Sequence, residues 1–267
     1  MRRLDFIIGG GQRCGSTTIA TMLARHADVC LCQPLRPEPK FFLHDKHEAP
    51  ALAARIDQSL AHAAADVTAV GEKSTSYLEV AEAAENIFRW QPQARLIFIL
   101  RHPLERAISN YRFSRAHGLE TLDFDTAIRT EPQRLANTSF PHLSAHPFAY
   151  LRRGHYAEML GPFCERFERQ QLLLLLHDDL RDDPAAVRDD LARFLHLRAD
   201  GWSSGDIRMN AHEPDGMSIS SATAEFVVNQ FTDANRELEA ILGRDLSAWG
   251  RVPPLSCIED GRATPAR

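Results

Sequence analysis

A glycine-rich turn between an apolar run and a helical pattern constrains the fold of this chain most strongly. The run Leu4–Ile8 leads into Gly9-Gly10-Gly11 and then Ser16-Thr17-Thr18, after which residues 19–24 show the apolar spacing of a helix. The order strand, turn, helix directs backbone N–H groups and the positive end of a helix dipole at one place. The sequence therefore predicts an anion-binding turn near the start of an α/β domain.

The turn matches the nucleotide-binding P-loop only in part. Gly10 and Gly15 have the spacing of G-x-x-x-x-G-K-[ST] and Thr17 supplies its hydroxyl, but Ser16 stands where the lysine belongs. A turn that only joins a strand to a helix is the alternative, because glycine spacing alone is a weak signal. The missing lysine argues against an ATP-dependent kinase, which needs it at the β- and γ-phosphates.

A second basic position follows the apolar run Ala94–Leu100. In P-loop enzymes a carboxylate after a later strand helps to hold Mg²⁺, whereas this strand is followed by Arg101. Pro103 suits the first turn of a helix, and Ser109 lies two turns into it. An arginine at this place predicts that the protein itself binds a second anionic group, with no metal between them.

Glu38 is a candidate general base. The prolines between residues 34 and 39 stiffen its loop, and we expect Phe41 and Phe42 to anchor that loop in the core. Proton abstraction requires a base fixed within hydrogen-bond reach of its substrate. A solvated loop glutamate is the alternative.

Lys73 follows a predicted strand over residues 67–70, and ligands of open α/β sheets bind outside the carboxyl ends of strands. A surface lysine in a turn is the alternative. Periodicity predicts further strands over 29–32, 94–100 and 172–176, and helices over 48–65, 79–89, 156–167, 184–195 and 222–242, with Gly243 ending the last.

The pattern is least regular between residues 113 and 151. Long loops in compact domains often bind ligands, so we expect the acceptor-binding region within residues 115–151. His142 and His146 are expected to contact the acceptor or lie on the surface. Without nearby cysteine or carboxylate partners, a metal site there is disfavoured.

Charge and cysteine content limit the possible partners and compartment. A formal net charge of −5 argues against a general nucleic-acid-binding protein. Five cysteines without a C-x-x-C pair indicate a reduced, cytoplasmic protein, and the sequence shows neither a signal-peptide pattern nor a membrane-spanning run. We expect one domain over residues 1–267, with a loose polar tail over 258–267.

Four motifs in order resemble those of sulfotransferases that use 3′-phosphoadenosine 5′-phosphosulfate (PAPS), of the branch that includes heparan-sulfate-type carbohydrate enzymes and bacterial relatives. The resemblance extends to about residue 197. The motifs are Gly10-Gly11-Gln12-Arg13-Cys14-Gly15-Ser16-Thr17-Thr18, Glu38-Pro39-Lys40-Phe41-Phe42, Gly71-Glu72-Lys73-Ser74 and Arg101-x-Pro-x-x-Arg106-x-x-Ser109-x-Tyr111.

The resemblance implies roles for particular residues. Glu38 would deprotonate the acceptor and Lys73 would contact donor or acceptor. Arg101 and Ser109 would bind the 3′-phosphate. Outside the stretch that carries the resemblance, Arg208 lies in a Gly-, Ser- and Asp-rich loop over 202–218 and is a further candidate for that phosphate. The 5′-phosphosulfate would lie on Arg13, Cys14, Gly15, Ser16, Thr17 and Thr18, where Arg13 takes the place of the family's catalytic basic residue, commonly lysine.

The expected protein is a P-loop NTPase-like α/β domain, with a mainly parallel sheet flanked by helices. It would transfer the sulfuryl group of PAPS to a hydroxyl of a small molecule or saccharide, giving 3′-phosphoadenosine 5′-phosphate (PAP), without a metal. An ATP-dependent small-molecule kinase and a non-catalytic nucleotide-binding module are the alternatives. The acceptor and the oligomeric state are not read from the sequence.

Overall fold

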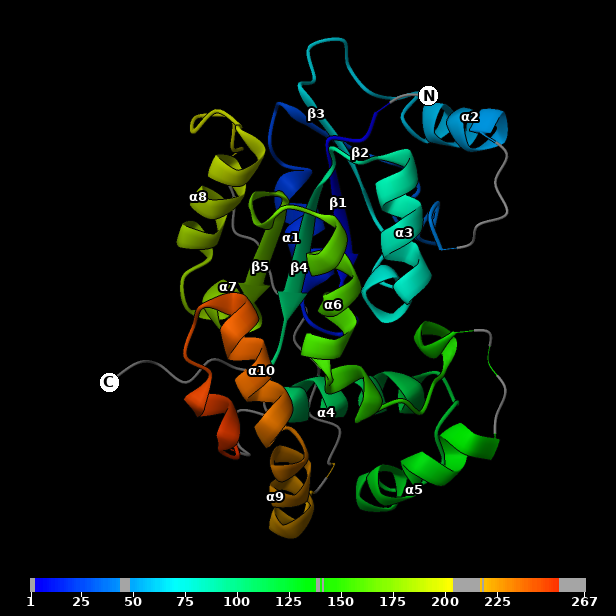
Figure 1. Ribbon diagram of the computed structural model, residues 1–267, viewed down its shortest axis with the longest axis vertical. Helices are drawn as coiled ribbons and strands as arrows, with labels where there is room; N and C mark the ends of the chain where they lie inside the picture. The colour runs from blue at the N-terminus through cyan, green and yellow to red at the C-terminus, as the bar shows by residue number, and fades with distance from the viewer. Residues whose placement is uncertain are drawn as a thin grey trace. The chain divides into compact units, whose positions relative to one another are not determined.

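Parallel strands in the order β2-β3-β1-β4-β5 form one sheet (Figure 1). Of the three inner strands, β1 and β4 are buried on both faces along nearly their whole length, which explains why they read as continuous apolar runs. The α/β fold with a parallel sheet is therefore confirmed. The strands are β1 (Phe6–Gly10), β2 (Val29–Leu31), β3 (Ala69–Lys73), β4 (Arg95–Leu100) and β5 (Leu172–Leu176).

The computed structural model describes residues 3–43, 49–137, 140, 142–203, 217 and 219–254. The chain divides into two compact units. The sheet unit comprises Met1–Leu100 and Leu160–Met209, and the helical unit comprises Arg101–Met159 and Asn210–Arg267. A single domain over the whole chain stays a prediction.

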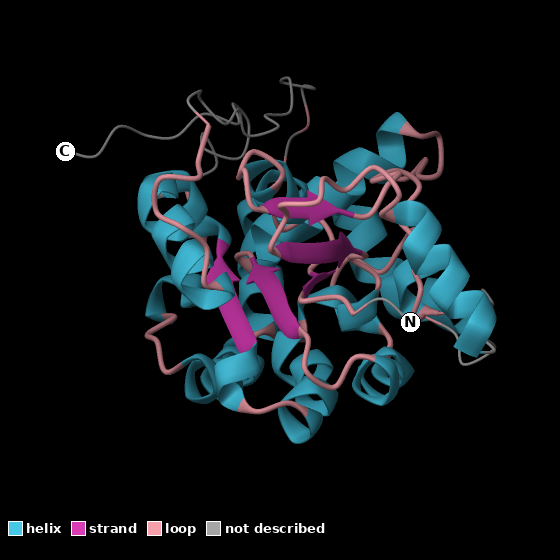
Figure 2. Cartoon of the chain, turned by 90° about the horizontal axis from the view of Figure 1, so that it is seen from above, coloured by secondary structure: helices cyan, strands magenta, loops and turns pink. Residues whose placement is uncertain are grey.

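Helices cover both faces of the sheet (Figure 2). Phe88 of α3 packs on Phe167, and Phe163 of α6 packs on Phe98 of β4, so these helices share one face. Helix α1 connects β1 to β2, whereas α3 connects β3 to β4, so the two connections cross the sheet in opposite directions. Because such crossovers are right-handed, α1 lies on the face opposite to α3. The helices are α1 (Ser16–Leu23), α2 (Ala49–Ser59), α3 (Ala81–Trp90), α6 (Tyr156–Arg166, which begins in the helical unit), α7 (His177–Asp182) and α8 (Pro184–Leu195).

The helical unit has its own core, to which α4, α5 and α9 contribute. No helix among the described residues is both long and apolar enough to cross a bilayer. The helices are α4 (Pro103–Ala116), α5 (Phe124–Asn137), α9 (Ser221–Gln230) and α10 (Thr232–Leu242), with short 3-10 turns at Leu143–Ala145, Arg152–Gly154 and Ser247–Gly250.

Two elements of the helical unit differ from the sequence prediction. Helix α5 continues to Asn137, so part of the expected long loop is helical. The single helix predicted over residues 222–242 is broken at Phe231, which leaves helical geometry with φ −106° and ψ 6°. Phe231 is fully buried against Gly154, where a Cβ atom would lie 2.5 Å from the Phe231 ring. Tertiary packing therefore decides the break, whereas Gly243 caps α10 as predicted, with φ 67°.

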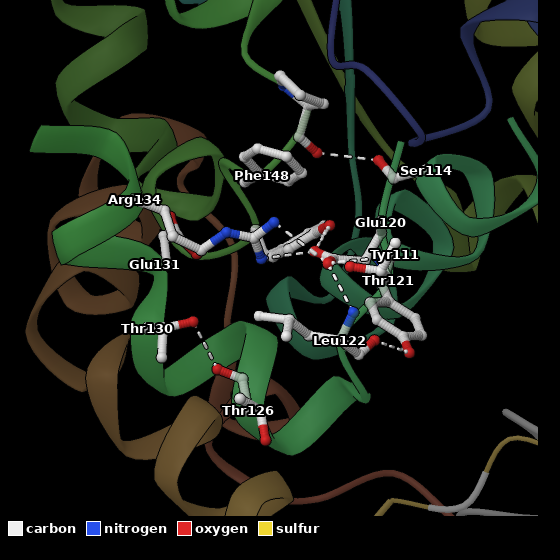
Figure 3. A network of polar contacts seen from close by, with 12 residues as sticks. Tyr111, Ser114, Glu120, Thr121, Leu122, Thr126, Thr130, Glu131, Arg134 and Phe148 are labelled. Carbon is white, nitrogen blue, oxygen red and sulfur yellow. Dashed lines mark hydrogen bonds and ion pairs between the residues drawn. The ribbon is translucent and has the colours of Figure 1, made fainter. Parts of the chain in front are cut away.

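A buried carboxylate organises the segment between α4 and α5 (Figure 3). Glu120 accepts hydrogen bonds from both terminal nitrogens of Arg134, at 2.6 and 3.1 Å, and from Tyr150 Oη at 2.7 Å. Burial raises the pKa of Glu120, but the bonds from Arg134 and Tyr150 outweigh it and leave the pKa below its usual value. This part of the expected acceptor-binding region is therefore held by an ion pair.

Glu120→Ala is expected to destabilise the protein by about 3 kcal/mol, because it leaves the Arg134 charge and the Tyr150 hydroxyl without their acceptor. Urea unfolding measures the loss. The control is Glu158→Ala, which removes a bidentate but exposed partner of Arg152 and should cost less than about 1 kcal/mol. Equal losses in the two variants would contradict the assigned importance of burial.

Candidate active site

The turn after β1 has backbone conformations that require glycine at both expected positions. Gly10 and Gly15 have φ values of +153° and +103°. A Cβ on Gly10 would lie 2.6 Å from Leu78 Cβ, and one on Gly15 would lie 3.2 Å from His177 Cδ2. Their spacing is therefore required by the fold of the turn itself.

Helix α1 begins directly after this turn. The N–H groups of Thr18 and Ile19 donate to the Gly15 carbonyl, at 2.9 and 3.2 Å. Helix geometry leaves the N–H groups of Ser16 and Thr17 without an acceptor inside the helix. Donors at a helix start, with the positive end of its dipole, are suited to an anion.

The other residues predicted for this turn have different surroundings. Arg13 is partly exposed and has φ 65°. Cys14 is fully buried, and its N–H and thiol bond to the carbonyls of Gly11 and Gln12 within the turn. The Ser16 and Thr18 side chains are buried, whereas that of Thr17 is partly exposed. Their contact with a phosphosulfate stays a prediction.

Glu38 and Lys73 form an ion pair with 2.5 Å between Oε1 and Nζ, and their side chains are only 16% and 5% exposed. Thr75 holds the same carboxylate, its N–H donating to Oε2 at 3.0 Å and its hydroxyl lying 3.0 and 3.1 Å from the two oxygens. Glu38 is therefore not a solvated loop glutamate, and Lys73 is not a surface lysine in a turn. Lys73 is the last residue of β3, which begins and ends later than predicted.

This ion pair lies at the same edge of the sheet as the glycine-rich turn after β1. Ile8 of β1 is in register with Lys73, and the Ser74 N–H donates to the Ile8 carbonyl at 3.0 Å. A Cβ on Gly10 would lie 3.2 Å from the Thr75 carbonyl oxygen. The residues that hold Glu38 therefore adjoin the turn after β1, where parallel sheets bind ligands.

The Glu38 segment is anchored as expected, by its two phenylalanines. Phe41 and Phe42 are 3% and 0% exposed. The Lys40 N–H donates to Ser74 Oγ at 2.9 Å, and the Phe42 N–H donates to Tyr77 Oη at 3.1 Å. Sequence reasoning missed the residues that hold this segment, because a pattern does not distinguish a buried hydroxyl from an exposed one. They are Glu72, Ser74, Thr75 and Tyr77.

Arg101 and Ser109 belong to the helical unit. Arg101 Nε donates to Glu105 Oε2 at 2.9 Å, and the Arg101 carbonyl accepts from Tyr156 Oη at 2.9 Å. Ser109 is buried on α4, one turn beyond Glu105 on the same helix face. Arg106 of the same motif is fully buried and donates to the Tyr150 carbonyl, which is a structural role.

The remaining predictions concern the loops. Arg208 and most of the loop over 202–218 lie outside the described residues, as does the tail over 258–267. His146 is 5% exposed and packs between the Phe140 and Phe148 rings, so it is a packed residue and not a surface one. Burial lowers its pKa, with a smaller contribution from Arg153. His142 is partly exposed, and its contact with an acceptor stays a prediction.

Comparison with known proteins gives a consistent assignment. A model of the sulfotransferase domain matches residues 3–213. The chain is 28% identical, over 72% of its length, to bifunctional heparan sulfate N-deacetylase/N-sulfotransferase 1 of Caenorhabditis briggsae, and equally to heparan sulfate glucosamine 3-O-sulfotransferase 3B1 of Mus musculus. It spans only 22% and 46% of the length of these relatives.

Solved structures share the fold over nearly the whole chain. A sulfotransferase from Alicyclobacillus acidocaldarius is 25% identical, with a TM-score of 0.78 over 94% of this chain and 100% of that one. The sulfotransferase domain from the curacin biosynthetic pathway has a TM-score of 0.52 at 16% identity, over 92% and 99% of the two chains, and shows the fold alone. With the domain match covering most of its length, this chain belongs to the sulfotransferase family.

Proposed function

We propose that this protein transfers the sulfuryl group of PAPS to a hydroxyl of a saccharide or small molecule and releases PAP. The observation that carries this proposal is the Glu38–Lys73 pair, held by Thr75 beside the anion-binding turn. It brings a carboxylate and a cation to the sheet edge that also carries the helix-start N–H groups. A mouse sulfotransferase solved in complex with PAP shares the fold, with a TM-score of 0.50.

The start of α1 is proposed to hold the 5′-phosphosulfate. The N–H groups of Ser16 and Thr17 and the hydroxyls of residues 16–18 supply donors, and Arg13 supplies charge. The transferred group carries diffuse negative charge between two roughly aligned oxygens. Positioning and preorganised cationic stabilisation are therefore the main contributions that the protein makes.

Glu38 is proposed to remove the proton of the acceptor. The acceptor oxygen forms a bond to sulfur, the bond between sulfur and the 5′-phosphate oxygen breaks, and the proton passes to the Glu38 carboxylate. Lys73, whose Nζ lies 2.5 Å from Glu38 Oε1, is proposed to stabilise the charge that moves onto the leaving phosphate. Thr75 fixes the orientation of the carboxylate during this exchange.

Arg101 and Ser109 are proposed to bind the 3′-phosphate directly, without a metal. Arg101 already pairs with Glu105, so a phosphate would take the place of that carboxylate on the guanidinium. We propose a cytoplasmic location for the enzyme, which is supported by the absence of a disulfide among the four cysteines that the structure describes. These are Cys14, Cys30, Cys32 and Cys164.

N-sulfation of an amine is the second candidate, because both an N-sulfotransferase and a 3-O-sulfotransferase are among the relatives. Saccharides that present either free amines or only hydroxyls separate the two reactions. Transfer of ³⁵S from PAPS to the hydroxyl series would support O-sulfation. Transfer only to the amine series would replace it.

Titration calorimetry with PAP tests the donor site, first in EDTA and then in Mg²⁺. We expect binding of similar affinity in both conditions. Binding that depends on Mg²⁺, or label transfer from ATP with none from PAPS, would contradict the proposal and favour the kinase. Tight PAP binding with no transfer to any acceptor would favour a non-catalytic module.

A further inference from the structure

We propose that Glu72 is a positioning residue, which fixes the segment carrying Glu38 through two hydroxyl relays. The part of this inference that concerns turnover rests on the proposed function, in which Glu38 is the base. The part that concerns the segment itself rests only on the contacts of the sheet unit.

Glu72 lies in β3 and is fully buried. Its Oε2 accepts from Ser74 Oγ at 2.7 Å, and its Oε1 accepts from Tyr77 Oη at 2.5 Å. A carboxylate without such donors would be costly at this depth, so the two hydroxyls are its required partners.

Each hydroxyl also forms a hydrogen bond with the backbone of the Glu38 segment. A hydroxyl has one proton to donate, and these two donate to Glu72, so their oxygens are left as acceptors. Ser74 Oγ accepts from the Lys40 N–H at 2.9 Å, and Tyr77 Oη accepts from the Phe42 N–H at 3.1 Å. The Glu72 carboxylate thus orients the two hydroxyl oxygens that accept from the backbone N–H groups of residues 40 and 42, two and four residues after Glu38.

The Lys40 backbone needs such a restraint. Its φ of 50° lies in the left-handed region, which a lysine adopts only where surrounding contacts hold it. The relay from Ser74 bonds to the N–H of this residue. Loss of the relay should therefore release the turn that follows Glu38.

Strand β3 holds the Glu38 segment by two adjacent residues. Successive side chains of a strand point to opposite faces. Lys73 donates a hydrogen bond to the Glu38 carboxylate. Glu72 instead acts through the Ser74 and Tyr77 hydroxyls on the backbone that follows Glu38. The orientation of Glu38 is thus fixed by contacts to its carboxylate and by contacts to the main chain that follows it.

The charge state of Glu72 decides whether both relays operate. Burial raises the pKa of Glu72 to about 7, while the bonds from Tyr77 and Ser74 lower it, Glu38 raises it and Lys73 lowers it. Burial, with a smaller contribution from the Glu72 charge, raises the pKa of Cys32, the residue directly after β2, to about 12. Burial and Glu72 raise the pKa of Tyr77 well above its usual value, so both groups stay neutral near pH 7.

Protonation of Glu72 disrupts this set of hydrogen bonds, because one oxygen of the Glu72 carboxyl group becomes a donor and either Ser74 or Tyr77 then loses the acceptor for its hydroxyl proton. Both relays are therefore intact only above a pH of about 7. The fold binds this proton more tightly than the unfolded chain does. The contribution of Glu72 to stability is thus complete below the usual carboxyl pKa and is lost as the pH rises to about 7. The ionised form of Glu72, which orders the Glu38 segment, is therefore the form in which the folded protein is less stable.

Hydrogen exchange on the full chain tests the relays without any acceptor. Ser74→Ala should lower protection of the Lys40 N–H, and Tyr77→Phe that of the Phe42 N–H, each by about fivefold to tenfold. Glu72→Gln keeps the shape but presents one oxygen, so at least one of the two amides should lose protection. Ile97 in β4 is the control and should not change in any variant.

Two exchange outcomes would overturn the relays. One is unchanged protection at Lys40 and Phe42 in all three variants. The other is loss in Glu72→Gln that is equally large at Ile97, which would show a general loss of packing.

Turnover from PAPS, with whichever hydroxyl or amine series accepts the label, tests the link to the reaction. Glu72→Gln should lower kcat by about 10-fold to 100-fold and leave the KM for PAPS unchanged. The wild-type rate should rise between pH 6 and 8 in a step that Glu72→Gln lacks. An unchanged kcat with altered exchange would overturn the positioning role. Full activity of Glu38→Gln would instead remove the base from the proposed function and leave the exchange results standing.

Discussion

Replacing Glu38 by glutamine will reduce sulfuryl transfer by about 100-fold to 10,000-fold, the range that loss of a general base produces. The glutamine side chain has the shape of the glutamate and keeps an oxygen that can accept from Lys73 and Thr75. The segment should therefore stay in place while its ability to take a proton is lost. Single-turnover transfer of ³⁵S from PAPS measures the chemical step apart from product release.

PAP binding supplies the control for this variant. PAP contains neither the sulfuryl group nor the acceptor, so its affinity should remain within about threefold of wild type, less than about 1 kcal/mol. Glu85→Gln is the matched control, because it removes an exposed carboxylate that pairs with Arg89 on α3. Transfer at the wild-type rate by Glu38→Gln would show that another group accepts the proton.

Replacing Arg101 by alanine will weaken PAP binding by about 10-fold to 100-fold, because it removes a charge-assisted bond of roughly 1.5–3 kcal/mol. Calorimetry measures the change. The kcat for transfer at saturating PAPS should fall much less, since the 3′-phosphate takes no part in bond making or breaking.

Glu105 complicates this variant, since loss of Arg101 leaves a carboxylate that would repel a phosphate. The double variant Arg101→Ala with Glu105→Gln separates the lost attraction from the new repulsion. Arg89→Ala removes the arginine of another arginine–glutamate pair one helical turn apart, and it should not change PAP affinity. Equal affinity of Arg101→Ala and wild type would remove Arg101 from the proposed donor site.

Local sequence patterns predicted most of the framework. The apolar runs of β1, β4 and β5 and the helical spacing of α3 and α8 follow from burial on one or both faces, which each segment records in its own residues. Predictions failed where side-chain packing decides. The break at Phe231 depends on Gly154, 77 positions earlier, and the burial of His146 depends on how the Phe140 and Phe148 rings pack against it.

The sequence by itself determined the glycine-rich turn between β1 and α1, because glycine, hydroxyl residues and helix start are neighbours in the chain and their geometry is local. It also marked Glu38 and Lys73 as separate candidates. Only the tertiary structure joined them, since 35 positions separate the two residues and the pairing of β2 with β3 brings the segment that follows β2 to the end of β3. The buried Glu72 relay was decided in the same way, because burial is a property of packed elements and no segment carries it alone.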